Sequence, residues 1–337
     1  FAAAIMLYGF SFLYGALGGQ TTLERIGPGA SALATGAAAL TGGSALVIVG
    51  LLLSLAGLFF KMAAVPFHAY APDVYEGAAS PVTGLLGFLP KFAGFVAAAK
   101  LLAVFRWDTV NLEVVYWLLW IVAALTMTVG NTVALLQTNV KRMLAYSSIA
   151  HSGYMIIGLL VGPALVGGDG LLGDGPMRDG IAAMLFYMVV YGTMNLGAFA
   201  VLSAVARRGE PVEELRDLEG LGVRQPVLAL ALAVCAFSLM GFPPTAGLLG
   251  KVYIFSSAFA VGDAHPFARP LVVLAVIGVL NSAIGAAYYL RIVAACYTRA
   301  PDPASETRAI WGGGLSLIHI SEPPRTRLES YARFSFE

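Results

Sequence analysis

Long apolar stretches alternate with short polar segments along this chain. The apolar stretches lie near residues 1–17, 44–70, 81–105, 113–136, 142–162, 181–206, 226–259 and 270–298. A helix needs about 20 apolar residues to cross the hydrocarbon core of a bilayer. Backbone amides in lipid must be bonded within their own segment, which requires helices. The pattern therefore predicts an all-α polytopic membrane protein with about eight transmembrane helices.

Two of these stretches are too long for one straight crossing, and both contain proline. Each has one lysine close to its proline: Lys61 and Pro66 in the first, and Pro243, Pro244 and Lys251 in the second. Proline removes a backbone donor and interrupts a helix. The two stretches are five helices apart, so they are expected to cross in opposite directions. Broken helices at matching positions of inverted repeats are typical of ion-translocating folds.

Composition agrees with a membrane protein and excludes some partners. The chain is 58% hydrophobic and 12% charged, with a mean hydropathy of +0.80. A soluble domain carries about 25% charged residues. The net charge of +1 gives no indication of nucleic-acid binding. Cys235 and Cys296 both lie in apolar runs, which favours small core residues over a disulfide or a metal pair.

Basic residues in the polar segments predict the orientation. One set of alternate loops has Arg25, Arg106, Arg178 and Arg269; the other has Lys141, Arg142, Arg207, Arg208, Arg216, Arg224, Arg299 and Arg308. By the positive-inside rule the second set is cytoplasmic. The longest polar stretch on that side, 207–225, is expected to hold a short surface helix.

Four of the five lysines fall in apolar segments: Lys61, Lys91, Lys100 and Lys251. A lysine at the centre of a membrane helix costs about 2.5–3.5 kcal/mol on insertion scales. Lys100 lies near the end of its segment and fits a side chain that extends to the interface. The other three are too central for that. Because burial weakens a lysine's hold on its proton, they are candidates for a proton relay.

Two histidines extend this candidate relay. His68 follows Lys61 by seven residues, which would place both on one helical face, although Pro66 interrupts the helix between them. A carbonyl freed by that proline can solvate a water or an ammonium group. His151 lies mid-segment among hydroxyl side chains, within "YSSIAHSGY". Such a histidine is either a relay or a satisfied packing residue, and the neighbouring hydroxyls favour the relay.

Other polar features support weaker hypotheses. Asp73 and Glu76 are loop carboxylates that fit either a proton entry point or simple capping and solvation. Arg291 is expected at the interface, with pairing inside the protein as an alternative. The stretch 168–173, "GDGLLG", matches a dinucleotide-binding pattern but follows no strand, so it is interpreted as a loop.

Three stretches of the sequence resemble one known family. They are "KMAAVPFHAYAPDVYEGAASPVTGLLGFLPKFAGF", "LLQTNVKRMLAYSSIAHSGYMIIG" and "GFPPTAGLLGKVYIF". Together they are similar to the antiporter-like membrane subunits of respiratory complex I, and most of all to the subunit N type. Related subunits and cation/proton antiporters usually have PDAM-x-APTPVSA after the histidine and a further histidine before the next lysine. This chain has "PDVYEGA" and no histidine before Lys91.

The resemblance implies a fourteen-helix fold with two inverted five-helix repeats, of which this chain covers about eight helices. By that resemblance residues 1–110 are the C-terminal part of the first repeat and 111–300 are the second. Residues 301–337 are a polar tail, in which 312–337 look non-native. The chain begins at Phe1 within an apolar segment, so we expect it to be a fragment. The family's glutamate on the fifth helix then falls outside it.

The resemblance also implies a function. Lys61, Lys91 and Lys251 match the lysines of the broken seventh helix, the eighth helix and the broken twelfth helix, and His68 and His151 match polar-axis positions. The expected activity is proton translocation within an NADH-quinone oxidoreductase, a translocase, with no redox centre in this chain. NADH, FMN, iron–sulfur clusters and quinone are expected on other subunits.

Partners and alternatives follow from the same resemblance. The expected partners are other membrane subunits and the lipid bilayer, in a bacterial inner membrane. A multisubunit cation/proton antiporter without redox coupling is the alternative function. A solute transporter or a structural membrane subunit is a third possibility, which the lack of an intramembrane carboxylate disfavours.

Overall fold

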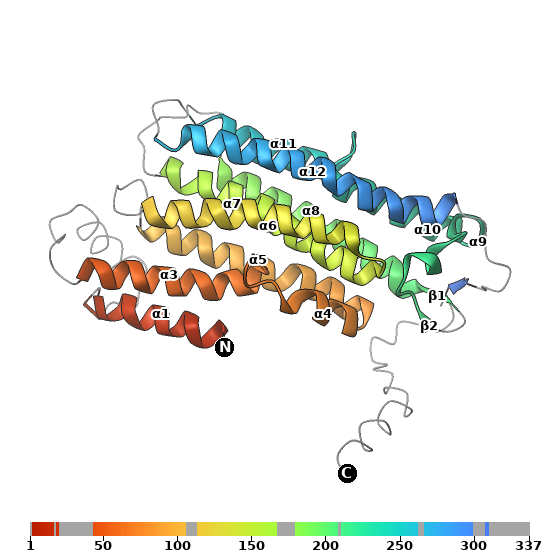
Figure 1. Ribbon diagram of the computed structural model, residues 1–337, viewed down its shortest axis with the longest axis horizontal. Coiled ribbons are helices and arrows are strands. Elements are labelled where there is room, and N and C mark those ends of the chain that lie inside the picture. The colour runs from red at the N-terminus through yellow and green to blue at the C-terminus, as the bar shows by residue number, and fades with distance from the viewer. Residues whose placement is uncertain are drawn as a thin grey trace, which may run out of the picture.

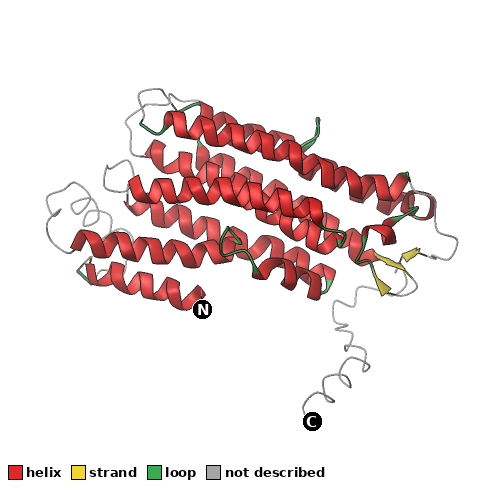
Figure 2. Cartoon of the chain, viewed as in Figure 1, coloured by secondary structure: helices red, strands yellow, loops and turns green. Residues whose placement is uncertain are grey.

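A computed structural model describes residues 2–16, 18–19, 43–105, 113–166, 179–207, 210–261, 266–298 and 307–309. Within these ranges the chain forms a bundle of long helices lying side by side (Figures 1 and 2). The helices are α1 (Ala2–Ala16), α3 (Gly43–Met62), α4 (Tyr70–Gly77), α5 (Ser80–Phe105), α6 (Glu113–Leu136), α7 (Val140–Val166), α8 (Gly180–Ala204), α9 (Leu221–Arg224), α10 (Pro226–Met240), α11 (Ala246–Phe259) and α12 (Ala268–Tyr297), with a 3-10 helix, η3, at Leu215–Leu218.

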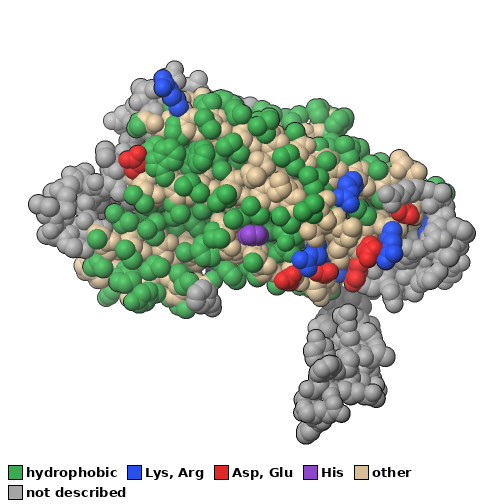
Figure 3. Space-filling model, in the orientation of Figure 1, with side chains coloured by type: hydrophobic (Ala, Val, Ile, Leu, Met, Phe, Trp, Pro, Cys, Tyr) green, Lys and Arg blue, Asp and Glu red, His purple; other side chains and the backbone are tan. Residues whose placement is uncertain are grey.

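Six of the described helices are long and apolar enough to cross a membrane by length and composition. The predicted helical architecture is therefore confirmed. Large apolar side chains are exposed on the outside of the bundle, among them Leu89, Val189 and Leu230 at 54–60%. The apolar surface covers the middle of the molecule, and charged side chains gather towards one end (Figure 3). An apolar exterior of this extent is suited to lipid rather than water.

Both predicted helix breaks are present. α3 ends at Met62, and the chain turns before α4 begins at Tyr70, with Ala63 at φ 53°. α10 ends at Met240 and is capped by Gly241 at φ 86°, a left-handed conformation that glycine adopts without steric cost. The Val65–Pro66 and Pro243–Pro244 bonds within the breaks are both cis. The α3–α4 pair runs towards the end of the bundle that holds the strands, and α10–α11 runs away from it (Figure 1).

One prediction about the first break is wrong. Lys61 and His68 were expected on one helical face because two helical turns span seven residues. The helix ends one residue after Lys61, and His68 lies in the irregular segment before α4. The seven-residue argument holds only along a continuous helix, so it does not apply here.

α7 lies at the centre of the bundle. Nearly all residues of its span Val140–Gly162 are buried, and it packs against α4, α5, α6, α8, α11 and α12. Most polar side chains on α7 therefore face protein rather than lipid. His151 and the hydroxyl residues around it are on this helix.

The polar segment after α8 covers one end of the bundle and contains the short helices η3 and α9, as predicted. The strands β1 (Val205–Arg207), β2 (Glu210–Pro211) and β3 (Thr307–Ala309) form a small antiparallel sheet in the order β2-β1-β3, which the sequence did not predict. The backbone amide of Val140 donates to the Glu213 carbonyl, so this segment is tied to the turn between α6 and α7. Within the tail, residues 312–337 lie outside the described residues, as does the loop 168–173.

Candidate functional site

Lys91 lies on α5 with its ammonium group turned towards α7. The side chain is 3% exposed, and Nζ donates hydrogen bonds to the carbonyl and the hydroxyl oxygen of Ser148. The Tyr75 hydroxyl of α4 lies 3.3 Å from the same Ser148 Oγ. The Tyr191 ring of α8 lies beneath the ammonium, 5.8 Å from its centroid. The lysine is thus solvated by hydroxyl, carbonyl and aromatic groups and is shielded from lipid.

His151 lies one helical turn further along α7 and is 2% exposed. Its Nδ1 is 2.6 Å from the Tyr187 hydroxyl of α8, and its Nε2 is 2.9 Å from the Tyr289 hydroxyl of α12. In a neutral imidazole one nitrogen donates and the other accepts, and a tyrosine hydroxyl can do either. Both ring nitrogens are therefore satisfied, and the ring joins two different helices through groups that can exchange protons.

A third polar cluster follows on the side of α12. The Asn131 amide nitrogen donates to the Tyr154 hydroxyl at 3.1 Å, and the Tyr288 hydroxyl donates to the Asn131 amide oxygen at 3.0 Å. All three side chains are buried. The Tyr288 and Tyr289 rings lie 4.5 Å apart, so this cluster adjoins the side chain that meets His151.

Lys251 lies on α11, one turn after the second break, and is 4% exposed. Its Nζ donates to the Leu239 carbonyl at 3.2 Å, the Met240 carbonyl at 2.8 Å and the Ser282 hydroxyl at 2.8 Å. The two carbonyls are the last of α10, where a helix has unpaired acceptors and the negative end of its dipole. The Tyr154 ring lies 5.3 Å from the ammonium. The break therefore supplies the acceptors that stabilise a buried cation.

Gly241 makes this arrangement possible for two reasons. Its φ of 86° is one that other residues rarely adopt. A Cβ at this position would also lie 3.2 Å from Lys251 Cδ and 3.4 Å from Nζ. The glycine at the end of α10 therefore allows the lysine side chain to pass close to the backbone.

These groups form a buried polar axis that crosses the bundle from α5 through α7 to α11. The residues of the axis are Lys91, Ser148, Tyr191, His151, Tyr187, Tyr289, Tyr288, Asn131, Tyr154 and Lys251. Hydrogen bonds connect some neighbours directly, and ring contacts connect the others. Lysine, histidine, serine and tyrosine can each donate or accept, depending on protonation state. The axis thus places groups that can carry protons in a row across the bundle.

The structure brings together three of the five predicted site residues: Lys91, His151 and Lys251. The Lys61 side chain is exposed. Among the described residues, none forms a hydrogen bond or an ion pair with its ammonium group. Its stem lies near α5, because a Cβ at Gly94 would be 3.4 Å from Lys61 Cβ. His68 is half-buried, and its Nδ1 has no partner among the described residues.

Other sequence predictions can be located as well. Lys100 is exposed near the end of α5, consistent with a side chain that extends to the interface. Arg291 is exposed and donates to the Leu135 carbonyl at 2.7 Å. Asp73 and Glu76 lie on α4 and pair with Arg142. They are therefore not simply solvated loop carboxylates.

Sequence reasoning missed the polar side chains that join the lysines, namely Asn131, Tyr187, Tyr191, Ser282, Tyr288 and Tyr289. Each lies in an otherwise apolar helix. The sequence did contain one sign of a polar helical face, because Tyr187 and Tyr191 are four residues apart and so lie on the same side of their helix. Tyrosine in a membrane helix is more often an interfacial anchor, which hides this signal.

Comparison with known proteins agrees with this geometry. The family described as NADH:quinone oxidoreductase/Mrp antiporter, transmembrane, matches residues 1–284. Subunit N of NADH-quinone oxidoreductase from Trichlorobacter lovleyi is 47% identical over 234 residues, which are 69% of this chain and 43% of that protein. A subunit N from Herpetosiphon aurantiacus is 42% identical over 320 residues, 94% of this chain and 59% of that protein.

Solved structures give the same result. A chain of respiratory complex I from Thermus thermophilus with bound aureothin matches with a TM-score of 0.67 and 32% identity, covering 93% of this chain and 59% of that chain. A chain of the Mrp complex from Dietzia has a TM-score of 0.69 at 24% identity, covering 90% of this chain and 49% of that chain. The second match shows the shared fold alone.

A bundle of apolar helices with two lysine-bearing breaks and a polar axis defines an antiporter-like membrane protein. The chain belongs to the NADH:quinone oxidoreductase/Mrp antiporter membrane family. It spans about half the length of the curated relatives it matches, from 43% to 62%.

Proposed function

We propose that this chain is part of a subunit N of a proton-pumping NADH-quinone oxidoreductase. The observation that carries the proposal is the buried axis from Lys91 through His151 to Lys251. Placing three ionisable groups inside an apolar bundle is costly, and each is surrounded by groups that stabilise a proton. A chain that needed only to span the membrane would have apolar side chains at these positions.

In this proposal electron transfer takes place on other subunits, which hold NADH, FMN, iron–sulfur clusters and quinone. The free energy of that reaction changes the protonation of the lysines here. Lys61 passes its proton towards Lys91, and Lys251 exchanges with the far side of the membrane. His151 and the tyrosine hydroxyls connect the two halves. The chain itself does no redox chemistry.

The partners and location belong to the same proposal. The subunit lies in a bacterial inner membrane and contacts other membrane subunits of its complex. Residues 1–110 belong to a first inverted repeat, 111–300 to a second and 301–337 to a polar tail. The opposite directions of α3–α4 and α10–α11 support the repeat assignment (Figure 1).

A multisubunit cation/proton antiporter is the second candidate, since members of that class share the fold. The relatives named as subunit N, at 42–47% identity, favour the redox-linked complex over this alternative. An antiporter would respond to added Na⁺ or K⁺ without NADH. Collapse of an imposed pH gradient by either cation, unaffected by NADH, would support the second candidate.

The test uses the full-length subunit in its assembled complex, in inside-out membrane vesicles. NADH-driven acidification and NADH-to-quinone activity are measured for Lys61→Ala and Lys91→Ala. Lys100→Ala is the matched control, because Lys100 is on the same helix as Lys91 but is exposed near its end. We expect both activities to fall about tenfold or more in the two site variants, since a positioned proton-transferring group typically contributes about 10²–10⁴-fold. Wild-type pumping in both would exclude the relay.

A further inference from the structure

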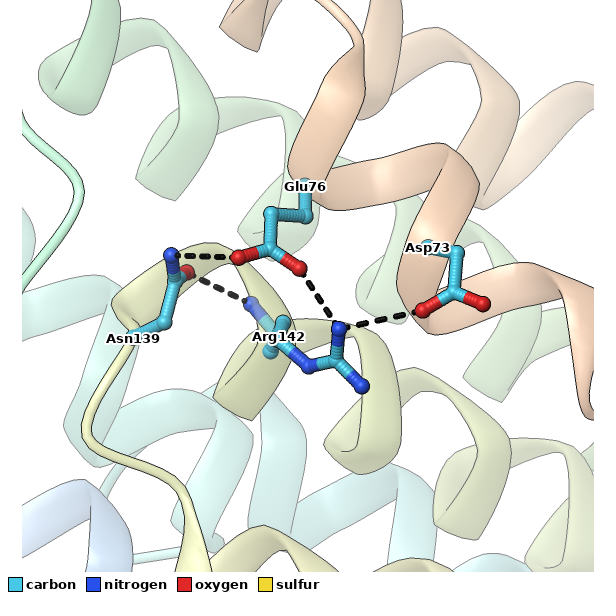
Figure 4. Close-up of polar contacts among 4 residues, drawn as sticks. All are labelled: Asp73, Glu76, Asn139 and Arg142. Atoms are coloured by element: carbon cyan, nitrogen blue, oxygen red, sulfur yellow. Dashed lines mark hydrogen bonds and ion pairs between the residues drawn. The ribbon is translucent and has the colours of Figure 1, made fainter.

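Four polar side chains join α4 to the start of α7 at the charged end of the bundle (Figure 4). Arg142 Nη1 lies 3.0 Å from Asp73 Oδ1 and 2.6 Å from Glu76 Oε2. The Asn139 amide nitrogen donates to Glu76 Oε1 at 3.3 Å, and its oxygen accepts from the Arg142 backbone amide at 3.1 Å. One guanidinium nitrogen thus holds two carboxylates of α4, and Asn139 orients one of them.

The neighbouring lysine holds the backbone of the same element. Lys141 is 4% exposed, and its Nζ donates to the Ala78 carbonyl at 3.3 Å. Ala78 follows the last residue of α4, where a helix presents unpaired carbonyls. Two consecutive cations of α7 therefore fix both the side chains and the C-terminal end of α4.

α4 depends on such contacts because it is only eight residues long and follows the break. Isolated helices of this length are marginal in water without tertiary packing. The position of α4 against α7 consequently depends on the contacts made by Arg142 and Lys141. Glu76 and Arg142 side chains are 39% and 31% exposed, so this pair is more shielded than Asp73, which is 73% exposed.

Tyr75 lies between the two carboxylates in the sequence and contacts the polar axis. Its side chain is 3% exposed, and its hydroxyl is 3.3 Å from the Ser148 Oγ that accepts from Lys91. Gly87 of α5 lies close to this hydroxyl, since a Cβ there would be 3.2 Å from it and 2.5 Å from Asn195 Nδ2. A shift of α4 therefore changes the first hydrogen bond beyond Lys91.

We propose that Arg142 is a positioning residue for proton transfer at Lys91. It acts by clamping α4 through Glu76 and Asp73, which keeps the Tyr75 hydroxyl against Ser148. This inference rests on the proposed function of the lysine axis. It assigns a role in proton transfer to Arg142, which lies outside that axis.

The chemistry explains why the position of Tyr75 matters. When Lys91 is protonated, it donates to Ser148 Oγ, and the serine hydroxyl is free to donate to Tyr75. When Lys91 gives up its proton, its nitrogen becomes an acceptor for the serine hydroxyl, and Tyr75 can then donate to Ser148 Oγ. The serine and tyrosine hydroxyls reverse their hydrogen bonds together. Ser148 Oγ therefore has the Tyr75 hydroxyl as a second partner in both protonation states of Lys91 while α4 stays in place.

The experiment measures NADH-driven acidification over a range of pH in vesicles with the full-length subunit in its complex. Arg142→Gln and Tyr75→Phe are each expected to lower the rate about fivefold and to displace its pH profile. The double variant should be no slower than the slower single variant, because both changes act through one contact. Arg142→Lys should stay within about twofold of wild type, since one ammonium can donate to both carboxylates as Nη1 does.

Arg216→Gln is the control. Arg216 pairs with Glu214 at 2.7 Å at the same end of the bundle, and it forms no ion pair with α4 among the described residues. Its removal should leave the rate and the profile unchanged. Equal amounts of assembled complex are verified for every variant, and Tyr75→Phe, which keeps the ring, tests the idea if Arg142→Gln fails to assemble.

Each outcome has a defined meaning. Arg142→Gln that behaves like Arg216→Gln overturns the inference, as does additive loss in the double variant. The inference is also overturned if Glu76→Gln pumps more slowly than wild type while Arg142→Gln pumps at the wild-type rate. The Glu76 carboxylate would then be a proton carrier and not part of a clamp. If Arg142→Gln pumps at the wild-type rate and Lys91→Ala does not pump, only the positioning role of Arg142 is refuted. Wild-type pumping by Lys91→Ala refutes the proposed function itself.

Discussion

Replacement of His151 separates its packing role from its proton-transfer role. His151→Leu fills the buried volume but removes both hydrogen bonds, to Tyr187 at 2.6 Å and Tyr289 at 2.9 Å. His151→Gln keeps one amide donor and one acceptor of similar reach, but an amide does not change its protonation state. The pair of variants therefore differs in hydrogen bonding and shares the loss of a titratable group.

The magnitudes follow from burial. His151 is 2% exposed and Tyr187 is fully buried, so His151→Leu leaves buried hydroxyls with fewer partners. An unsatisfied buried polar group costs about 1–3 kcal/mol. We expect His151→Leu to reduce the amount of assembled complex or its thermal midpoint, and His151→Gln to preserve both. Both variants should pump at about a tenth of the wild-type rate or less, since proton transfer through a positioned side chain contributes at least that factor.

The assay is NADH-driven acidification in inside-out vesicles, normalised to the amount of complex and measured beside NADH-to-quinone activity. A His151→Gln variant that pumps at the wild-type rate would refute the relay. In that case His151 is a satisfied core histidine that holds α7, α8 and α12 together, which is the alternative left open by the sequence.

Two further predictions concern the second break. Lys251→Met keeps the length of the side chain and leaves the Leu239 and Met240 carbonyls without their cation, so pumping should fall about tenfold or more; Ser282→Ala removes one of three hydrogen bonds and should cost about fivefold. Pumping at the wild-type rate by both variants would contradict a role for Lys251 and Ser282 in proton transfer. Gly241→Ala places a Cβ 3.2 Å from Lys251 Cδ in a left-handed conformation, and we expect the thermal midpoint of the complex to fall by an amount equivalent to about 1–2 kcal/mol. An unchanged midpoint would show that the break relaxes around the side chain.

The helices and their breaks could be predicted because hydropathy and proline act locally. The predicted stretch 226–259 corresponds to α10 and α11 with the break at 241–245, and 113–136 matches α6 residue for residue. The error came where a local rule was extended through a break, as with Lys61 and His68. Helical periodicity has no meaning once the backbone leaves the helix, and sequence spacing alone does not report where that happens.

The site was only half predictable for a related reason. An ionisable side chain in an apolar helix is visible in the sequence because its burial is costly. A tyrosine or serine in the same helix costs much less, so Tyr187, Tyr289 and Ser282 do not stand out. Their role depends on which helices meet, and that is decided by tertiary packing around α7. The sequence therefore reveals the ionisable groups of the proposed relay, whereas the groups that join them require the fold.

The two helix breaks use their unpaired backbone groups differently. At the second break the acceptors for Lys251 come from within the chain, through the last carbonyls of α10. At the first break the Met62 carbonyl instead accepts from Ser152, and the Val65 amide donates to Thr126. Two of the polar groups freed by the first break are thus used to attach it to α6 and α7, and among the described residues no hydrogen bond to the Lys61 ammonium is formed. A helix break supplies unpaired backbone groups, but the neighbouring side chains determine whether those groups bind an ammonium or fix the break in place.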